Sequence, residues 1–131
     1  MKKFILISFA ALLFITACKK AKTTAHLWVD VNIGRSITDF NIPDSLHTLV
    51  GGSLVKPGSS YVINTASDNS SNRNVKTLDF GELQPGTYQV DSIHGYAYGD
   101  SVYVILGAQD TTPVFTLKAG IDQTLIVNLT P

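Results

Sequence analysis

The sequence predicts an all-β domain, a Greek-key β-sandwich of about seven strands, and two observations lead to this prediction. All ten glycines and all five prolines of the 131-residue chain follow Cys18, where they recur between short apolar runs. No segment after Cys18 keeps a helical period over several turns. Regular turn signals without helical periodicity are typical of a sandwich or a barrel.

The predicted strands follow one another from residue 26 onward. Residues 26–33 alternate strictly, which places Leu27 and Val29 on one face and His26 and Trp28 on the other. The other predicted strands cover residues 48–50, 61–64, 75–80, 87–93, 102–106, 114–119 and 124–129.

Glycines mark the predicted turns between these strands. Gly51-Gly52, Gly95 and Gly107 each follow a predicted strand, so we expect them to lie in turns. Residues 102–106 are apolar throughout, which predicts a central strand covered on both faces. Residues 67–74 are polar and predict a loop.

The first eighteen residues form a separate segment. Lys2 and Lys3 precede residues 4–17, an uncharged and mostly apolar stretch. As a helix this stretch rises about 21 Å, which is short of the roughly 30 Å hydrocarbon core of a bilayer. It therefore predicts a secretory signal peptide over residues 1–17 rather than a membrane span.

The end of this segment reads Ile15-Thr16-Ala17-Cys18 and resembles the lipobox of bacterial lipoproteins. The resemblance implies cleavage between Ala17 and Cys18, and attachment of a diacylglyceryl group and a further acyl chain, such as palmitate, to Cys18. Residues 18–24 would then be a lipidated tether, and residues 25–131 the β-sandwich domain. Lys19 stands where inner-membrane lipoproteins of enteric bacteria often carry Asp, so the resemblance favours the outer membrane of the cell envelope.

The charge of the predicted domain limits its partners. From Ala25 onward, five basic residues face ten acidic ones, which gives a net charge of −5. Binding to phosphate backbones requires clustered Lys and Arg. We therefore expect no nucleic-acid partner, and the sequence points to no cofactor.

A second resemblance lies at residues 78–90, which read Leu-Asp-Phe-Gly-Glu-Leu-Gln-Pro-Gly-Thr-Tyr-Gln-Val. This resembles the Phe-Gly-x-Leu-x-Pro-Gly-x-Tyr-x-Val signature of carboxypeptidase-regulatory-like and other transthyretin-like β-sandwich domains. Pro85 fixes φ for a tight turn, and Tyr88 can bury its ring while its hydroxyl bonds nearby backbone, as in a tyrosine corner. The motif predicts an Ig-like or transthyretin-like fold and no chemistry.

Residues suited to catalysis are few. His26, His47 and His94 are the near-neutral bases, and no two of them have the close spacing of zinc ligands. We therefore predict no catalytic residue and no metal site. A small hydrolase or metal-dependent enzyme stays as a third alternative, and its metal-dependent form requires the three histidines to converge.

The segment from His94 to Asp100 is the best candidate for ligand binding. Tyr96 and Tyr98 are two residues apart, so their rings can face one side and stack on sugar rings, with Trp28 as a companion. The alternative is that both tyrosines extend the preceding strand and pack onto the sheet.

The leading hypothesis is a non-enzymatic envelope lipoprotein whose tethered sandwich serves as an interaction or structural module. A carbohydrate-binding module that uses Tyr96, Tyr98 and Trp28 is the alternative. The partners would be the membrane, through lipid on Cys18, and a glycan or an envelope protein. Asp110-Thr111-Thr112 also resembles the Asp-Ser/Thr-aliphatic acceptor of periplasmic O-glycosylation, which makes Thr111 a candidate glycosylation site.

Overall fold

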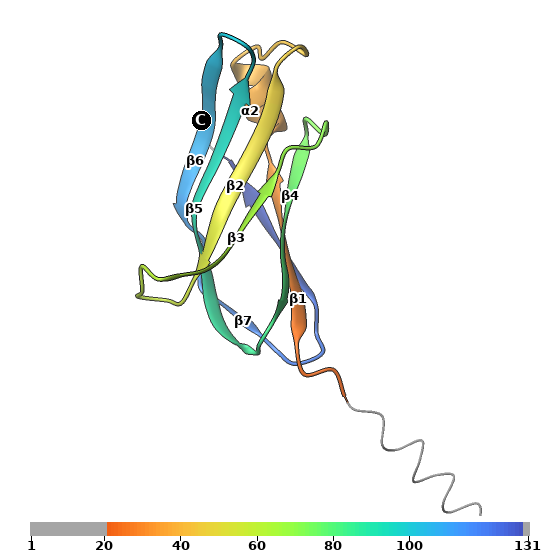
Figure 1. The fold of residues 1–131 in the computed structure, drawn as a ribbon, viewed down its shortest axis with the longest axis vertical. Coiled ribbons are helices and arrows are strands. Elements are labelled where there is room, and N and C mark those ends of the chain that lie inside the picture. The colour runs from red at the N-terminus through yellow and green to blue at the C-terminus, as the bar shows by residue number, and fades with distance from the viewer. Residues whose placement is uncertain (1–20, 130–131) are drawn as a thin grey trace, which may run out of the picture.

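The computed structural model describes residues 21–129, apart from the side chains of residues 110 and 111, and confirms the all-β sandwich (Figure 1). The predicted signal peptide, Ala17 and Cys18 lie outside the described residues. Each predicted strand overlaps a strand of the structure, and the described residues form eight. These are β1 (Ala25–Asn32), β2 (His47–Val55), β3 (Val62–Asp68), β4 (Val75–Leu83), β5 (Gly86–Tyr98), β6 (Tyr103–Thr111), β7 (Phe115–Leu117) and β8 (Gln123–Asn128).

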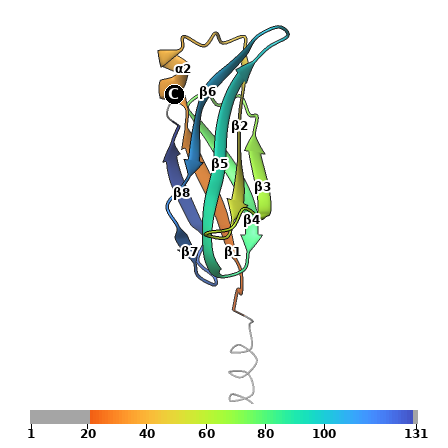
Figure 2. The same ribbon diagram turned by 90° about the vertical axis from the view of Figure 1, so that its left-hand side faces the viewer.

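Three strands form the first sheet, sheet A, in the order β4-β1-β8. β1 pairs antiparallel with β4 and parallel with β8. The alternation predicted for β1 is confirmed, because Leu27, Val29 and Val31 are fully buried between the sheets. Five strands form sheet B, in the order β3-β2-β5-β6, with β7 paired to the first three residues of β5. Figure 2 shows the two sheets packed face to face.

The prediction that Gly51-Gly52, Gly95 and Gly107 form turns was wrong. They lie within β2, β5 and β6. The strands carry glycine at Gly52 and Gly95 because these positions face the packed interior, where a side chain would collide with its neighbours. A Cβ on Gly52 would lie 3.1 Å from Leu78 Cδ1, and one on Gly95 would lie 2.4 Å from Leu129 Cδ2.

The prediction of a central strand at residues 102–106 was also wrong. β6 lies at an edge of sheet B and pairs with β5. Leu106 faces the core and is fully buried, whereas the side chains of Tyr103 and Ile105 are 63% and 59% exposed on the outer face. In this chain, the wholly apolar run therefore forms an edge strand with one face in the core and the other face exposed to solvent.

The helix α2 (Gly34–Asp39) was not predicted. It has six residues, which is too short for a helical period to show in the sequence. Ile37 packs against the core, and Thr38 Oγ1 donates a 3.0 Å hydrogen bond to the Gly34 carbonyl. α2 covers the end of the sandwich opposite to the start of β1 (Figure 2).

The motif at residues 78–90 is a structural element. Phe80 is 1% exposed in the core, and Gly81 adopts φ +76° next to a register shift between β1 and β4, where a side chain would be strained. The ring of Tyr88 is buried, and its hydroxyl donates a 2.6 Å hydrogen bond to the Gln84 carbonyl. The contact predicted by analogy with a tyrosine corner is thereby confirmed.

One charged side chain is enclosed by the fold. Lys76 alternates inward on β4 beside Leu78 and is fully buried. Its ammonium group donates to the Ser70 carbonyl, and burial lowers the pKa of Lys76 although Asp68 lies near enough to oppose the shift. The 69–74 loop therefore closes over Lys76 instead of standing free.

Candidate ligand-binding face

The outer face of sheet B gathers aromatic side chains because of the alternation along β5. Ile93 and Ala97 point inward and are fully buried, so His94, Tyr96 and Tyr98 point outward. The structure therefore keeps Tyr96 and Tyr98 on one side, as predicted. Both tyrosines also belong to β5, as the alternative prediction of an extended strand required. Their side chains lie on the solvent-facing side of that strand.

The turn between β5 and β6 adds a third tyrosine to this face. The backbone N–H of Gly99 donates to the Val102 carbonyl at 2.9 Å, and this closes a hairpin in which Tyr103 pairs with Tyr98. Tyr103 was not identified from the sequence. The register of a hairpin is the sequence signal that could have identified it, because a tight turn after Tyr98 places Tyr103 opposite it on the same face.

The rings on this face form two neighbouring groups, one of His94, Tyr96 and Tyr103 and one of His47 and Tyr98. The ring centroids of His94 and Tyr96 are 6.3 Å apart at 11°, and those of Tyr96 and Tyr103 are 5.2 Å apart at 31°. The His47 ring from β2 lies 5.6 Å from that of Tyr98. Desolvation and the neighbouring Tyr96 phenol raise the pKa of Tyr103. We call His47, His94, Tyr96, Tyr98 and Tyr103 the aromatic face.

A shallow hollow of about 340 Å³ adjoins the aromatic face on the surface of sheet B. His94, Tyr96 and Gly51 are among the residues that line it. Of the described residues that line the hollow, none is Lys, Arg, Asp or Glu. The lining consists of Gly51, Gly52, Ser53, Thr65, Ala66, Ser67, Ser92, His94 and Tyr96.

Trp28 does not join the aromatic face. It lies on β1 in sheet A, where its ring stacks on His26 with centroids 4.0 Å apart and an interplanar angle of 18°. Because both residues point away from the core on the other sheet, the predicted trio is divided. Tyr96 and Tyr98 share a surface, and Trp28 belongs to a different one.

The surroundings of His26 form a charged cluster where the tether enters the domain. His26 Nε2 lies 2.5 Å from Asp79 Oδ1, and His26 Nδ1 lies 3.4 Å from Glu82 Oε1. Lys22 Nζ lies 2.7 Å from Asp122 Oδ1 and 3.2 Å from Glu82 Oε1. This cluster therefore ties residues of the predicted tether to β4 and to the start of β8.

The protonation of His26 should make the stability of the domain depend on pH. The hydrogen bond with Asp79 raises the pKa of His26 above its ordinary value of 6.5. The bond with His26 lowers the pKa of Asp79, while the Thr24 hydroxyl and Lys22 lower that of Glu82. A raised histidine pKa stabilises the fold below about pH 6.5, and this contribution disappears as pH rises through the folded-state pKa.

We therefore expect His26→Gln to destabilise the domain more at pH 5.5 than at pH 9, measured by urea unfolding at both values. Asp79→Asn removes the nearest carboxylate and should largely remove this pH dependence. Below about pH 4 the carboxylates protonate and the wild-type advantage should fall again. An equal loss at pH 5.5 and pH 9 would contradict an ionic role for His26.

The histidines do not converge. His26 lies on sheet A, and His47 and His94 lie on different strands of sheet B. Within residues 21–129, no three His, Cys, Asp or Glu side chains are grouped as metal ligands. The arrangement required by the metal-dependent alternative is therefore not found in the part of the chain described.

Two predicted modification sites remain without a described side chain. Cys18 precedes the described residues. Thr111, which was expected in a loop, is the last residue of β6, and its backbone pairs with Asp91. The described residues contain no helix long and apolar enough to cross a membrane.

Comparisons with known proteins add little to this picture. No protein-family model matches the chain, and no curated protein matches it. Among solved structures, it is similar to a leucine-rich repeat protein from Bacteroides thetaiotaomicron, with 16% identity and a TM-score of 0.45. The match covers 84% of this chain and 14% of that one, so the chain spans a small part of its length. A similarity at this level carries no information about a ligand.

Proposed function

We propose that this protein is a lipid-anchored, non-enzymatic module of the cell envelope that binds its partner through the aromatic face. The single observation that carries the proposal is the exposure of this face. Tyr103 is 63% exposed, Ile105 beside it is 59% exposed, and both adjoin Tyr96 and Tyr98. Contiguous exposed apolar groups on a soluble domain commonly mark an interaction site.

The face is built on rigid elements. β5 and β6 pair along most of their length, and the inward residues of β5 are locked in the core. Tyrosine rings on such strands supply large contact area with little loss of conformational freedom on binding. Ligand binding therefore requires no rearrangement of the sheet.

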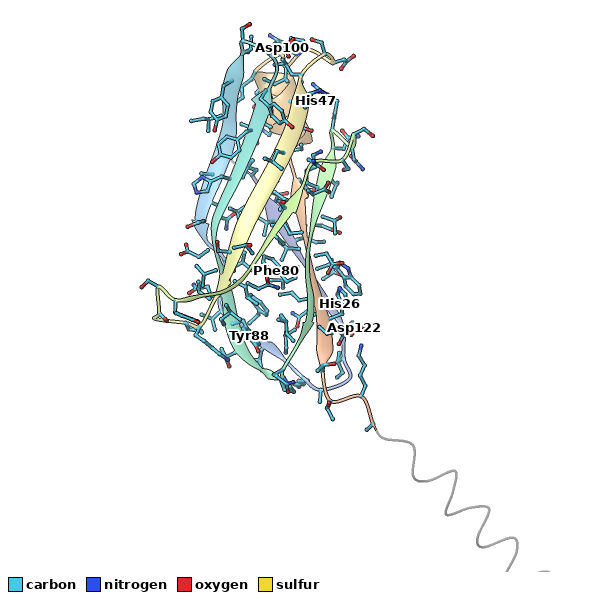
Figure 3. The ribbon with its side chains drawn as sticks, viewed as in Figure 1. His26, His47, Phe80, Tyr88, Asp100 and Asp122 are labelled. Atoms are coloured by element: carbon cyan, nitrogen blue, oxygen red, sulfur yellow. The ribbon has the colours of Figure 1, made fainter. Side chains whose placement is uncertain are left out.

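The position of the face suits a tethered protein. In Figure 3, His26 and Asp122 lie near the end where the chain enters the domain, and His47 lies toward the opposite end. A lipid on Cys18 would hold the first end near the bilayer. The His47 end of the aromatic face would then lie away from the membrane, where a partner can reach it.

The proposal can be tested by co-sedimentation of purified residues 21–131 with isolated cell envelopes. The buried core residues that the structure describes all lie between Ala25 and Leu129, so this fragment keeps the described core. We expect the double variant Tyr96→Ala, Tyr103→Ala to bind at least about tenfold more weakly, because aromatic anchors dominate binding energy.

Tyr61→Ala is the matched control, because Tyr61 is 76% exposed but lies outside the aromatic face. It should bind envelopes like the wild type. Equal binding by the wild type and the double variant, or none by either, would overturn the proposal.

A further inference from the structure

We propose that the hollow beside Tyr96 is a binding site for an uncharged sugar ring, and that Gly51 is the residue that keeps it open. This inference rests on the proposed function and names the ligand class for the same surface. It depends on three features, which are the lining of the hollow, its aromatic side, and a strand glycine whose own φ and packing leave room for a side chain.

The glycine is the most informative feature. Gly51 lies inside β2, paired with Ser67 on one side and His94 on the other. Glycine in a strand interior weakens the strand because it gains no side-chain packing and loses more entropy. A residue with this cost needs a compensating reason.

The ladder beside Gly51 is irregular, because the register of β2 and β5 shifts between Gly51 and Ser53. The extra residue of this bulge lies on β5, where Ser92 adopts φ +54°. The bulge therefore does not require a glycine at Gly51.

Neither the backbone conformation of Gly51 itself nor its packing requires glycine. The φ of Gly51 lies outside the left-handed region, and the nearest atoms to an added Cβ would be the Ala66 carbonyl oxygen at 3.7 Å and Ser67 Cβ at 4.0 Å. These are ordinary contact distances. The neighbouring Gly52 differs, because its added Cβ would press on the core at 3.1 Å from Leu78. A strand glycine with free space above it allows a ligand to approach the backbone closely.

The chemistry around Gly51 matches a sugar. Hydroxyl groups of Ser53, Thr65, Ser67 and Ser92 can donate and accept hydrogen bonds, as sugar hydroxyls do. The nearly parallel rings of His94 and Tyr96 offer apolar surface for the C–H face of a pyranose. With no Lys, Arg, Asp or Glu in the described lining, the hollow offers no permanently charged group to pair with a charged ligand.

A peptide strand fits this place less well. The hollow lies over β2, β3 and β5, and the β2 backbone already pairs with a strand on each side. Strand addition requires a free sheet edge. A ligand that lies over β2 must therefore be recognised by side chains and ring faces.

The experiment measures binding of neutral oligosaccharides to residues 21–131, first on a glycan array and then by calorimetry with the strongest binder. The decisive variant is Gly51→Val, which fills the hollow with a residue that favours strands. We expect it to unfold at the same or a higher urea concentration than the wild type. We also expect at least about tenfold weaker sugar binding.

Thr124→Val is the matched control, because it adds valine to an exposed position of β8 on the other sheet. It should leave sugar binding unchanged. Sugar binding that survives Gly51→Val would overturn the assignment of the hollow, even if Tyr96→Ala, Tyr103→Ala abolished it.

Envelopes treated with periodate, which cleaves vicinal diols of sugars, separate this inference from the proposed function. Weaker binding to treated than to untreated envelopes supports the sugar. Equal binding to both, still dependent on Tyr96 and Tyr103, would overturn the sugar while the binding module stands. No binding to untreated envelopes would refute the proposed function itself.

Discussion

Replacing Phe80 with alanine is expected to lower the free energy of unfolding by about 3 to 5 kcal/mol, because it removes a large ring from a packed core. Phe80 is 1% exposed and belongs to the cluster of buried residues drawn from both sheets. Neighbouring strands are held by their ladders and cannot collapse fully into the cavity. Urea unfolding at neutral pH measures the loss.

Ile126→Ala is the matched control for this experiment. Ile126 is a large apolar residue in a strand of sheet A, but it is 73% exposed. Its truncation should change the free energy of unfolding by no more than about 0.5 kcal/mol. A loss below about 1 kcal/mol for Phe80→Ala would contradict the placement of Phe80 in the core.

Replacing Cys18 with alanine is expected to release the protein from the membrane. Lipid chains anchor a protein in proportion to buried methylenes, at about 0.8 kcal/mol each, and two or more chains make the anchoring stable. Cys18 is the one cysteine of the chain, so the variant has no substitute thiol. Fractionation of cells, together with labelling by an alkyne analogue of palmitate, measures both attachment and its loss.

Thr23→Ala serves as the control, since it changes the predicted tether and leaves Ile15-Thr16-Ala17-Cys18 intact. It should stay labelled and membrane-bound. If the Cys18→Ala variant remained in the membrane fraction, the lipid anchor would be refuted. The binding face would be unaffected by that result, because it depends on residues of sheet B.

The strands could be predicted because burial imposes a period on the sequence. Leu27, Val29 and Val31 alternate with polar neighbours, and that pattern specifies both a strand and its inner face. The buried position of Lys76 on β4 was not predicted, because its charge argued for the surface. Its hydrogen bond to Ser70 depends on a loop path that no local pattern encodes.

The positions of the strand glycines and of the sheet edge were harder to predict. A glycine in a turn and a glycine under a close contact look alike in a sequence, which is why Gly52 and Gly95 were misassigned. The apolar run of β6 suggested cover on both faces, but the number of layers is set by strand order, which is a tertiary property. The error concealed the exposed side chains of Tyr103 and Ile105.

The candidate site was predicted in part for the same reason. Spacing alone placed Tyr96 and Tyr98 on one side, because residues two apart in a strand share a face. Trp28 and Tyr103 could not be assigned by spacing, since their positions depend on which sheet β1 joins and on the register of the β5–β6 hairpin. Strand pairing, rather than residue spacing, therefore decides which residues belong to the site.

The most direct test of the aromatic face is tyrosine iodination of the full chain, read by mass spectrometry, in intact envelopes and after purification in detergent. If the face holds a partner in the envelope, Tyr98 and Tyr103 should be modified much less in envelopes than in the purified protein. Tyr61, exposed elsewhere, should be modified equally in both. Equal modification of Tyr103 in the two samples would contradict a binding role for the aromatic face.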